Sequence, residues 1–248
     1  MNETRFIIYN KELIEIMIAS VIFGREGSKG LPGKNTMNIL GKVIMEYPLI
    51  GCQNSKYINK MYVSTDSDDI ADIAMKYNCD YIHRPDELCT DGALLQDAIF
   101  HSYKAISMNN DLEYLVITMC NAPNITTESI DKGIQMLRDD QTIDSVITVG
   151  RYDMFSPERA RTPDSNNQLK PYVPFSELSE NASCDRSSYK PTYFADGGMT
   201  VVRAKCLEEM NTNLLPFLWM GKNIGYIVQS PGGFDVDDLW QVKTSELW

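Results

Sequence analysis

Short apolar runs alternate with stretches of helical spacing along most of this chain, and this alternation limits the folds that it can adopt. Met17–Phe23 is a near-continuous apolar run that ends at Gly24, a pattern typical of a strand buried on both faces of a parallel sheet. Lys60–Thr65 predicts a second strand, and Ser67 follows it as the cap of a helix. In that helix the apolar residues lie three and four positions apart, at Ile70, Ile73, Ala74 and Tyr77.

The same pattern of strand and helix recurs further along the chain. Alternation of this kind implies an α/β fold in which a mainly parallel sheet is covered by helices on both faces. With 43% hydrophobic residues in a chain of 248, there are enough apolar side chains for one substantial core. The further elements are predicted as strands at Asp80–Ile82, Glu113–Met119 and Asp144–Val149, and as helices at Leu94–Ile106 and after a cap at Thr127.

The alternation of strand and helix patterns stops between residues 151 and 191, where prolines, serines and asparagines interrupt the apolar periodicity. So long a connection is unusual inside a compact domain, and we predict an inserted lid or oligomerisation arm. Residues 1–16 are predicted to be an N-terminal extension, and residues 17–248 the main domain. Regular structure resumes with a strand at Tyr193–Arg203, a short helix near Ala204–Met210, a strand at Ile224–Gln229 and a last helix after Asp237.

Charge and cysteine content exclude several classes of function. A net charge of −11 argues against nucleic-acid binding, because that affinity depends on many lysines and arginines that neutralise phosphates. The six cysteines form no Cys-x-x-Cys pair and do not cluster with a histidine, so neither a structural zinc site nor a disulfide framework is expected. No apolar stretch approaches the roughly 20 residues that cross a membrane, and the N-terminus lacks the order of a signal peptide. We expect a cytoplasmic protein with no membrane partner.

A glycine-rich loop with three cations follows the first buried strand. Glycines recur at every third position from Gly24 to Gly33, and Arg25, Lys29 and Lys34 supply positive charge in an acidic chain. Glycines let backbone amides approach a ligand closely, and together with cations they can surround a triphosphate. The carboxyl end of a strand is where ligands bind an open parallel sheet. We therefore predict an anion-binding loop, with a flexible solvated turn as the alternative.

The loop resembles a known family. Arg25-x-x-Ser28-Lys29-Gly30-x-x-x-Lys34-Asn35 is similar to the signature of the cytidylyltransferases that activate sialic acid and related nonulosonic acids. Val63–Asp66 and Arg84-Pro85-x-x-Leu88-x-x-Asp91 follow in the order that this resemblance requires. The resemblance implies a three-layer, Rossmann-like nucleotide-diphospho-sugar transferase fold from about Met17 to Leu247. It implies phosphate contacts from Arg25, Lys29 and Lys34, and nucleotide contacts from Gly27, Ser28, Gly30, Asn35, Arg84, Asp91 and Asn121.

An acidic segment lies near the end of the chain. In an extended segment side chains alternate, so Asp235 and Asp237 should point the same way while Val236 faces the core. Two carboxylates on one side can hold Mg²⁺ and leave positions for phosphate and water. The family carries an Asp-x-Asp metal site here, so we predict Mg²⁺ at Asp235 and Asp237. The alternative is that Asp237 or Asp238 only caps the last helix.

Two segments depart from the family pattern. Met119–Pro123 (Met-Cys-Asn-Ala-Pro) replaces the family's Gln-Pro-Thr-Ser-Pro run near the base, so that Asn121 or a backbone group substitutes for the missing amide, or the segment is an ordinary turn. Asp196 and Gly197 stand where the family has Asn-Gly-Ala close to the sugar. Our hypothesis is that Asp196 adapts the pocket to an unusual nonulosonic acid bearing an amino group. Arg186 is close to where the family places an arginine that grips the sugar carboxylate.

The sequence thus predicts transfer of CMP from CTP to a nonulosonic sugar acid, of the sialic, legionaminic or pseudaminic type, with release of pyrophosphate. The partners are then CTP, a small acidic sugar and a second copy of the chain, since the family's relatives are dimers whose inserted segment reaches the neighbouring subunit. His83 and His101 are expected to be structural. Rival functions are nucleotidyl transfer with another base or acceptor, such as Kdo or a phosphonate, and an inactive nucleotide-binding regulator.

Overall fold

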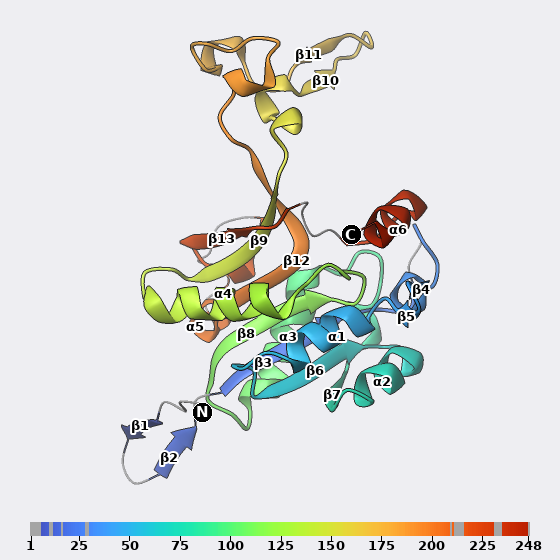
Figure 1. The fold of residues 1–248 in the computed structure, drawn as a ribbon, viewed down its shortest axis with the longest axis vertical. Coiled ribbons are helices and arrows are strands. Elements are labelled where there is room, and N and C mark those ends of the chain that lie inside the picture. Colours follow the sequence, from blue (N-terminus) through green and yellow to red (C-terminus); the bar gives the residue numbers. More distant parts are fainter. Residues whose placement is uncertain are drawn as a thin grey trace.

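The computed structural model describes residues 6–9, 12–15, 17–27, 30–208, 210, 216–230 and 235–247. Within these residues a seven-stranded sheet has the order β13-β9-β12-β8-β3-β6-β7 (Figure 1). Its strands are β3 (Met17–Phe23), β6 (Lys60–Thr65), β7 (Cys79–His83), β8 (Leu112–Met119), β9 (Ser145–Arg151), β12 (Tyr193–Arg203) and β13 (Ile224–Val228).

The sheet is mainly parallel. Strand β3 pairs in parallel with β6 and β8, β6 pairs in parallel with β7, and β13 pairs in parallel with β9. Strand β12 runs antiparallel to both of its neighbours, β8 and β9. Its pairing with β9 shifts register between Ala195 and Thr200, which places Asp196 and Gly197 in an irregular stretch at the edge of the sheet. The carboxyl ends of β3, β6 and β8 meet at one edge, because parallel strands end on the same side.

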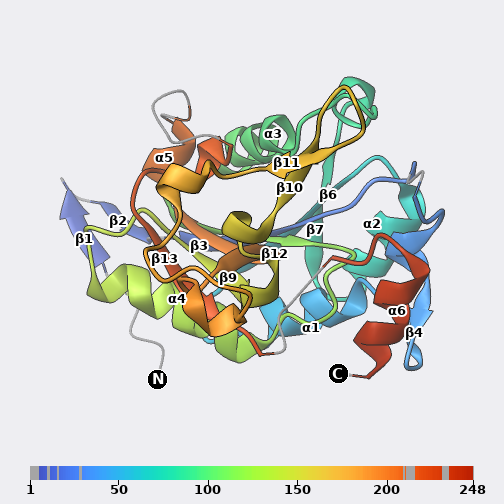
Figure 2. The same ribbon diagram turned by 90° about the horizontal axis from the view of Figure 1, so that it is seen from above.

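Helices cover both faces of the sheet and make three layers (Figure 2). Alternate residues of β3 point to opposite faces, so Ile18 and Ile22 belong to one core cluster and Ala19, Val21 and Phe23 to the other. The first cluster includes side chains of α1 (Glu46–Gln53), α2 (Asp68–Met75) and α4 (Thr127–Asp139), and the second includes side chains of α3 (Leu95–Ser107), α5 (Ala204–Glu208) and the 3-10 turn η8 (Leu218–Met220). The sequence-based prediction of a mainly parallel α/β sheet is therefore confirmed.

A small third cluster fixes the acidic segment. Val236 is fully buried and packs with Ile39, Ile44 and Val242. Ile39 belongs to β4 (Asn38–Ile39), which forms a hairpin with β5 (Lys42–Val43), and Val242 belongs to the last helix, α6 (Leu239–Glu246). The glycine-rich loop leads into β4 through the 3-10 turn η1 (Lys34–Thr36), so this cluster joins the loop to the end of the chain.

Residues between β9 and β12 project from the sheet as an arm (Figure 1). The arm contains one short hairpin, β10 (Arg161–Pro163) with β11 (Leu169–Pro171), and otherwise mostly 3-10 turns. Its exposed large side chains include Met154, Phe155, Tyr172 and Phe175. Those turns are η3 (Asp153–Phe155), η4 (Pro157–Arg159), η5 (Phe175–Glu177) and η6 (Arg186–Ser188), and η2 (Asp86–Leu88) lies elsewhere, after β7.

Most predicted elements appear with small shifts, and two predictions were wrong in detail. The residue that caps α4 is Thr126, whose side chain accepts from the Ser129 amide, and Thr127 is the first residue inside the helix. Tyr77 lies beyond the end of α2 at Met75. Helix α1 was missed because its sequence contains Pro48 and Gly51, although proline is tolerated in the first turn of a helix.

The remaining described residues add little to the sheet. Residues 6–9 (β1, Phe6–Tyr9) and 12–15 (β2, Glu12–Glu15) pair as an antiparallel hairpin of their own. All six cysteines are free thiols, and Cys52, Cys79 and Cys120 are buried. Among the helices in the described part of the chain, none has the length and apolar character needed to cross a bilayer.

Candidate active site

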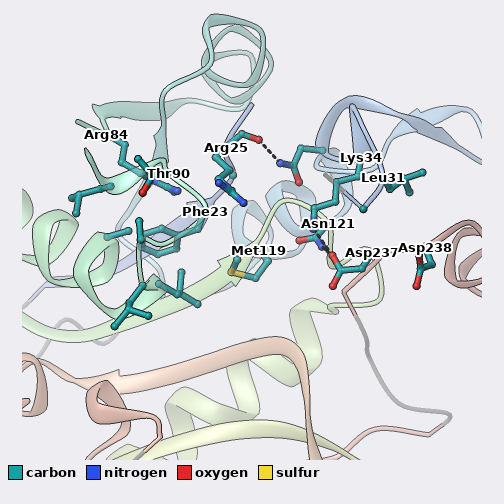
Figure 3. A pocket seen from close by; sticks show the side chains of 18 residues that line it. Phe23, Arg25, Leu31, Lys34, Arg84, Thr90, Met119, Asn121, Asp237 and Asp238 are labelled. Atoms are coloured by element: carbon teal, nitrogen blue, oxygen red, sulfur yellow. Dashed lines mark hydrogen bonds and ion pairs between the residues drawn. The ribbon is translucent and has the colours of Figure 1, made fainter. Parts of the chain in front are cut away.

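A cavity of about 520 Å³ opens at the carboxyl ends of β3 and β8 (Figure 3). The glycine-rich loop forms one wall and the acidic segment before α6 another. The residues that line it include Arg25, Gly30, Leu31, Lys34, Asn35, Arg84, Asn121, Asp237 and Asp238. Most residues predicted from the sequence to bind a nucleotide therefore face one cavity.

The two cations described in the glycine-rich loop are both paired with acids. Arg25 donates through Nη1 to the Cys89 carbonyl oxygen at 2.8 Å and through Nη2 to Asp91 Oδ1 at 3.1 Å. Lys34 Nζ forms an ion pair with Asp237 Oδ1, 203 positions away in the sequence. The glycine-rich loop and the acidic segment are therefore in direct contact.

The loop backbone is shaped by close packing at some positions and open space at others. Gly30 passes so close to the acidic segment that a Cβ there would lie 3.3 Å from the Asp237 carbonyl oxygen, whereas one at Gly27 would meet nothing within 4 Å. Asn35 is buried and donates from Nδ2 to the Arg25 carbonyl oxygen at 2.9 Å, which closes the loop on itself. The predicted residues Ser28 and Lys29 lie outside the described residues.

Arg84 lies at the other end of the cavity. Its guanidinium is only 5% exposed and stands 5.5 Å from the Phe23 ring centre. Nη2 donates to the Ser64 carbonyl oxygen at 2.5 Å and Nε to Ser64 Oγ at 3.3 Å. Burial lowers the pKa of Arg84 below its ordinary value, although a guanidinium remains charged at neutral pH. This end of the cavity thus has a fixed cation in a largely apolar wall.

The acidic segment separates its carboxylates by role. Asp238 is the N-cap residue of α6, and the side chain of Gln241 accepts from the amides of Asp237 and Asp238. Capping thus involves Asp238, which also lines the cavity together with Asp237, whereas Asp235 lies outside the lining. Burial, followed by the nearby charge of Asp237, raises the pKa of Asp235 above its ordinary value. The fully buried Val236 faces the core, as the alternation of side chains predicts.

Asp235 instead approaches the irregular stretch of β12. Gly197 has a φ of +72°, and a Cβ there would lie 2.8 Å from Asp235 Oδ1. The neighbouring Asp196 is 6% exposed and accepts from Thr148 Oγ1 at 2.6 Å and from the Gly198 amide at 3.0 Å. Asp196 and Gly197 therefore lie beside the acidic segment.

The structure does not bring Arg186 to this cavity within one chain. Arg186 belongs to η6 in the arm, where it lines a separate hollow of about 720 Å³ with Arg151, Tyr152 and Asp153. His83, which contacts Tyr81, and His101 also lie outside the lining of the first cavity.

Sequence reasoning missed the apolar wall of the cavity. Phe23 and Met119 are the last residues of β3 and β8, so the rule that ligands bind at strand ends could have identified them. The others follow β7 or begin α3, where nothing in the sequence separates a cavity wall from ordinary core. The wall comprises Phe23, Leu88, Leu94, Leu95, Ala98 and Met119.

The carboxylates of the acidic segment fit a magnesium ion that is shared with a ligand. Within the described residues, no group of three or more His, Cys, Asp or Glu side chains is arranged to hold a metal by itself. Mg²⁺ is typically held by one or two carboxylates and completes its shell with water and substrate phosphates. Asp235 and Asp237 supply the two carboxylates, and the cavity beside Asp237 contains cations suited to phosphates. The donor set therefore suits Mg²⁺ bound together with a phosphate.

Comparison with known proteins agrees with this geometry. A model of the family described as "Cytidylyltransferase" matches residues 19–178. The chain is 30% identical over 134 residues to N-acylneuraminate cytidylyltransferase of Escherichia coli, which covers 54% of this chain and 31% of the E. coli protein. It is 29% identical over 195 residues to CMP-N,N'-diacetyllegionaminic acid synthase of Legionella pneumophila, covering 77% and 80% of the two chains. The chain thus spans about a third of the E. coli protein's length.

A solved structure shares the fold. The structure of CMP:2-keto-3-deoxy-manno-octonic acid synthetase complexed with CTP superposes with a TM-score of 0.66 over 93% of this chain and 97% of that one. At 13% identity the likeness establishes the architecture only.

Proposed function

This chain belongs to the cytidylyltransferase family, and from this premise we propose that it transfers CMP from CTP to a hydroxyl of a nonulosonic sugar acid and releases pyrophosphate. The names of the relatives support this acceptor class, since they include an N-acylneuraminate and a legionaminic acid enzyme. The observation that carries the proposal is the contact of Lys34 with Asp237, which brings the cationic loop and the acidic segment to one cavity.

The cations of the loop are proposed to hold the triphosphate. Arg25 and Lys34 face the cavity, and Lys29 belongs to the same loop. Gly27, Ser28 and Gly30 are proposed to offer backbone amides to the phosphates, because glycines let the backbone approach a ligand. Asn35 supports the loop by its hydrogen bond to the Arg25 carbonyl oxygen.

The other end of the cavity is proposed to hold the nucleoside. Arg84 is fixed beside the apolar wall, where a base can stack and accept hydrogen bonds from a guanidinium. Asp91 holds the Arg25 guanidinium by an ion pair and is proposed to orient it towards the nucleotide. With the triphosphate and the nucleoside bound in this way, the α-phosphate would lie near the acidic segment.

The reaction builds negative charge, and the chain's cations are placed to neutralise it. The sugar hydroxyl releases its proton to solvent and attacks the α-phosphorus, the bond from the α-phosphorus to the α,β-bridging oxygen breaks, and pyrophosphate leaves. Arg25 and Lys34 stabilise the charge that develops on the phosphate oxygens and the leaving group. Asp235 and Asp237 would hold Mg²⁺, which would supply further neutralisation and lower the pKa of the attacking hydroxyl.

The acceptor is proposed to bind beside β12. Asp196 and Gly197 border the acidic segment, so a sugar in line with the α-phosphate would approach them. Because Arg186 lies in the arm, we propose a homodimer in which the arm of each subunit brings Arg186 to the sugar carboxylate in the other's cavity. Asp196 would then favour an acceptor that carries an amino group.

The test is pyrophosphate release measured with each of the four nucleoside triphosphates against a panel of keto sugar acids that includes sialic, legionaminic and pseudaminic acids and Kdo. We expect CTP with a nine-carbon acid to give the fastest release, and Asp237→Asn to abolish it. Fastest release with Kdo or with another triphosphate would replace the acceptor or the base in this proposal. Tight CTP binding without release for any acceptor would identify a regulator instead.

A further inference from the structure

Asn121, at the carboxyl end of β8, is bonded to the acidic segment through both its backbone and its side chain. It is 3% exposed, although its side chain forms part of the cavity lining. The acidic segment lies more than a hundred positions later in the chain, and Figure 3 shows Asn121 beside Lys34 and Asp237. The departure from the family's Gln-Pro-Thr-Ser-Pro run is centred on this residue.

Two hydrogen bonds hold Val236 against Asn121. The Val236 amide donates to the Asn121 carbonyl oxygen at 2.8 Å, and Asn121 Nδ2 donates to the Val236 carbonyl oxygen at 3.0 Å. The Val236 side chain is fully buried among Ile39 and Ile44, so the segment cannot turn about its own axis without losing both bonds and this packing. The backbone that leads into Asp237 is fixed as a result.

The same amide also reaches the carboxylate. Asn121 Nδ2 lies 3.4 Å from Asp237 Oδ1, and Lys34 Nζ contacts that same oxygen. Both donors therefore contact Oδ1 of Asp237, and neither contacts Oδ2. Donors on one oxygen fix the rotation of a carboxylate and direct the other oxygen, which is how residues behind a metal ligand tune it.

We propose that Asn121 is a positioning residue that orients the Asp237 carboxylate for the metal, and that it does not read the base. The inference rests on the proposed function, because it concerns the metal that Asp235 and Asp237 would hold. An asparagine side chain has two N–H donors, and both are directed at the acidic segment, one at the Val236 carbonyl oxygen and one at Asp237. With Nδ2 engaged in this way, only Oδ1 of Asn121 could still contact a base, as an acceptor, and the preference for CTP over UTP tests that contact.

The experiment measures Mn²⁺ binding to the protein in the presence of CMP, whose phosphate can complete the metal's shell, from the loss of the free-ion signal in electron paramagnetic resonance. We expect Asn121→Ala to weaken Mn²⁺ binding by roughly 10- to 100-fold, the usual effect of removing a partner of a metal ligand. Asn121→Thr keeps one donor and should fall between the two proteins. Both variants keep the hydrogen bond from the Val236 amide to the backbone carbonyl oxygen of residue 121, so the acidic segment should stay in its position. Circular dichroism checks that both variants fold.

Asn110 offers a matched control. Its Nδ2 donates to the Ile106 carbonyl oxygen at 2.7 Å at the end of α3, just before the amino end of β8 and therefore away from the cavity. Asn110→Ala removes a similar bond between a side-chain amide and a carbonyl oxygen, and it should leave Mn²⁺ binding unchanged. A matching loss in this variant would show a general effect of stability and would overturn the proposal.

Pyrophosphate release then separates positioning from base reading. For Asn121→Ala we expect a lower kcat, partly recovered at high Mg²⁺, with an unchanged preference for CTP over UTP. Wild-type Mn²⁺ binding in this variant, a lost preference for CTP, or no Mn²⁺ binding by the wild type would each overturn the inference. If the wild type releases no pyrophosphate with any triphosphate but Asn121→Ala still weakens Mn²⁺ binding, the proposed function fails and the positioning role stands.

Discussion

The two ends of the cavity hold their cations in opposite ways. Arg84 is buried and donates to uncharged oxygens of Ser64, whereas Arg25 and Lys34 are paired with the carboxylates of Asp91 and Asp237. A ligand phosphate or a metal can compete for an ion pair at the surface, but it cannot easily displace a bond to a buried carbonyl oxygen. The Arg84 end, proposed to hold the nucleoside, is therefore preformed. The end with Arg25 and Lys34, proposed to hold the triphosphate, can exchange its partners for those of a ligand.

The largest effect is expected at the exchangeable end. Lys34→Ala should lower kcat for pyrophosphate release by about 100- to 1,000-fold, because it removes a charge aimed at the developing phosphate oxygens. Lys60 forms a comparable ion pair with Asp80 at 2.6 Å, but it begins β6 and so lies at the opposite edge of the sheet. Lys60→Ala is the control and should retain the wild-type rate. An active Lys34→Ala protein would remove this residue from the proposed mechanism.

The next prediction concerns the contribution of Arg84, at the preformed end of the cavity, to the free energy of unfolding. Arg84→Met should lower the free energy of unfolding by about 1–3 kcal/mol, since it removes a charged donor from the buried Ser64 carbonyl oxygen, which then keeps only the Gly24 amide at 3.3 Å. Arg203 is also buried and donates to the carbonyl oxygens of Ile143 at 2.8 Å and Asp140 at 3.1 Å. Urea denaturation should give a similar loss for Arg203→Met, but only Arg84→Met should also weaken CTP binding. Unaltered unfolding of Arg84→Met would mean that this end is not preformed.

A smaller effect on stability is expected at Gly197, where β12 lies against Asp235 of the acidic segment. Gly197→Ala should cost roughly 1–2 kcal/mol in the free energy of unfolding, because an L-residue is strained at a φ of +72°. The added Cβ would also press on Asp235 Oδ1. Gly92→Ala adds a Cβ that meets nothing within 4 Å and serves as the control in the same denaturation series. Equal stability of the two variants would indicate that the backbone of β12 around Gly197 can adjust to a side chain without a loss of stability.

The smallest effect belongs to the surface ion pair. Arg25→Met should change the free energy of unfolding by less than about 1 kcal/mol, as is usual for exposed pairs. Arg151, paired with Asp153 at 2.8 Å in the arm, gives a comparable variant outside the cavity. If Arg25→Met destabilised the protein as much as Arg84→Met, the contrast between the two ends would disappear.

Much of the fold could be predicted from local pattern. The bounds of β3, β6 and β12 follow directly from apolar runs ended by glycine, polar or charged residues. The pattern could not give the direction of β12, because an antiparallel strand inside a parallel sheet is as apolar as its neighbours. Helix α1 was missed because its proline and glycine are residues that disfavour a helix by local propensity. Packing against α4 stabilises this helix in the folded protein.

The candidate site was predictable in its parts but not in its contacts. The loop and the acidic pair were identified from residue types, and the family resemblance supplied their common location. The contacts of Asn121 with Val236 and Asp237 depend on a pairing between distant segments, which no spacing in the sequence encodes. The position of Arg186 was unpredictable for the same reason, since the arm carries it away from the cavity of its own chain.

The arm joins the sheet through two strands that are already paired with each other. Tyr193 of β12 lies opposite Arg151 of β9, so the chain leaves and re-enters the sheet at adjacent points. In topological terms the whole projection is the loop of a single hairpin, and a short turn could replace it without breaking any strand of the sheet. Insertions of very different length can therefore be accommodated at this point without changing the fold of the sheet.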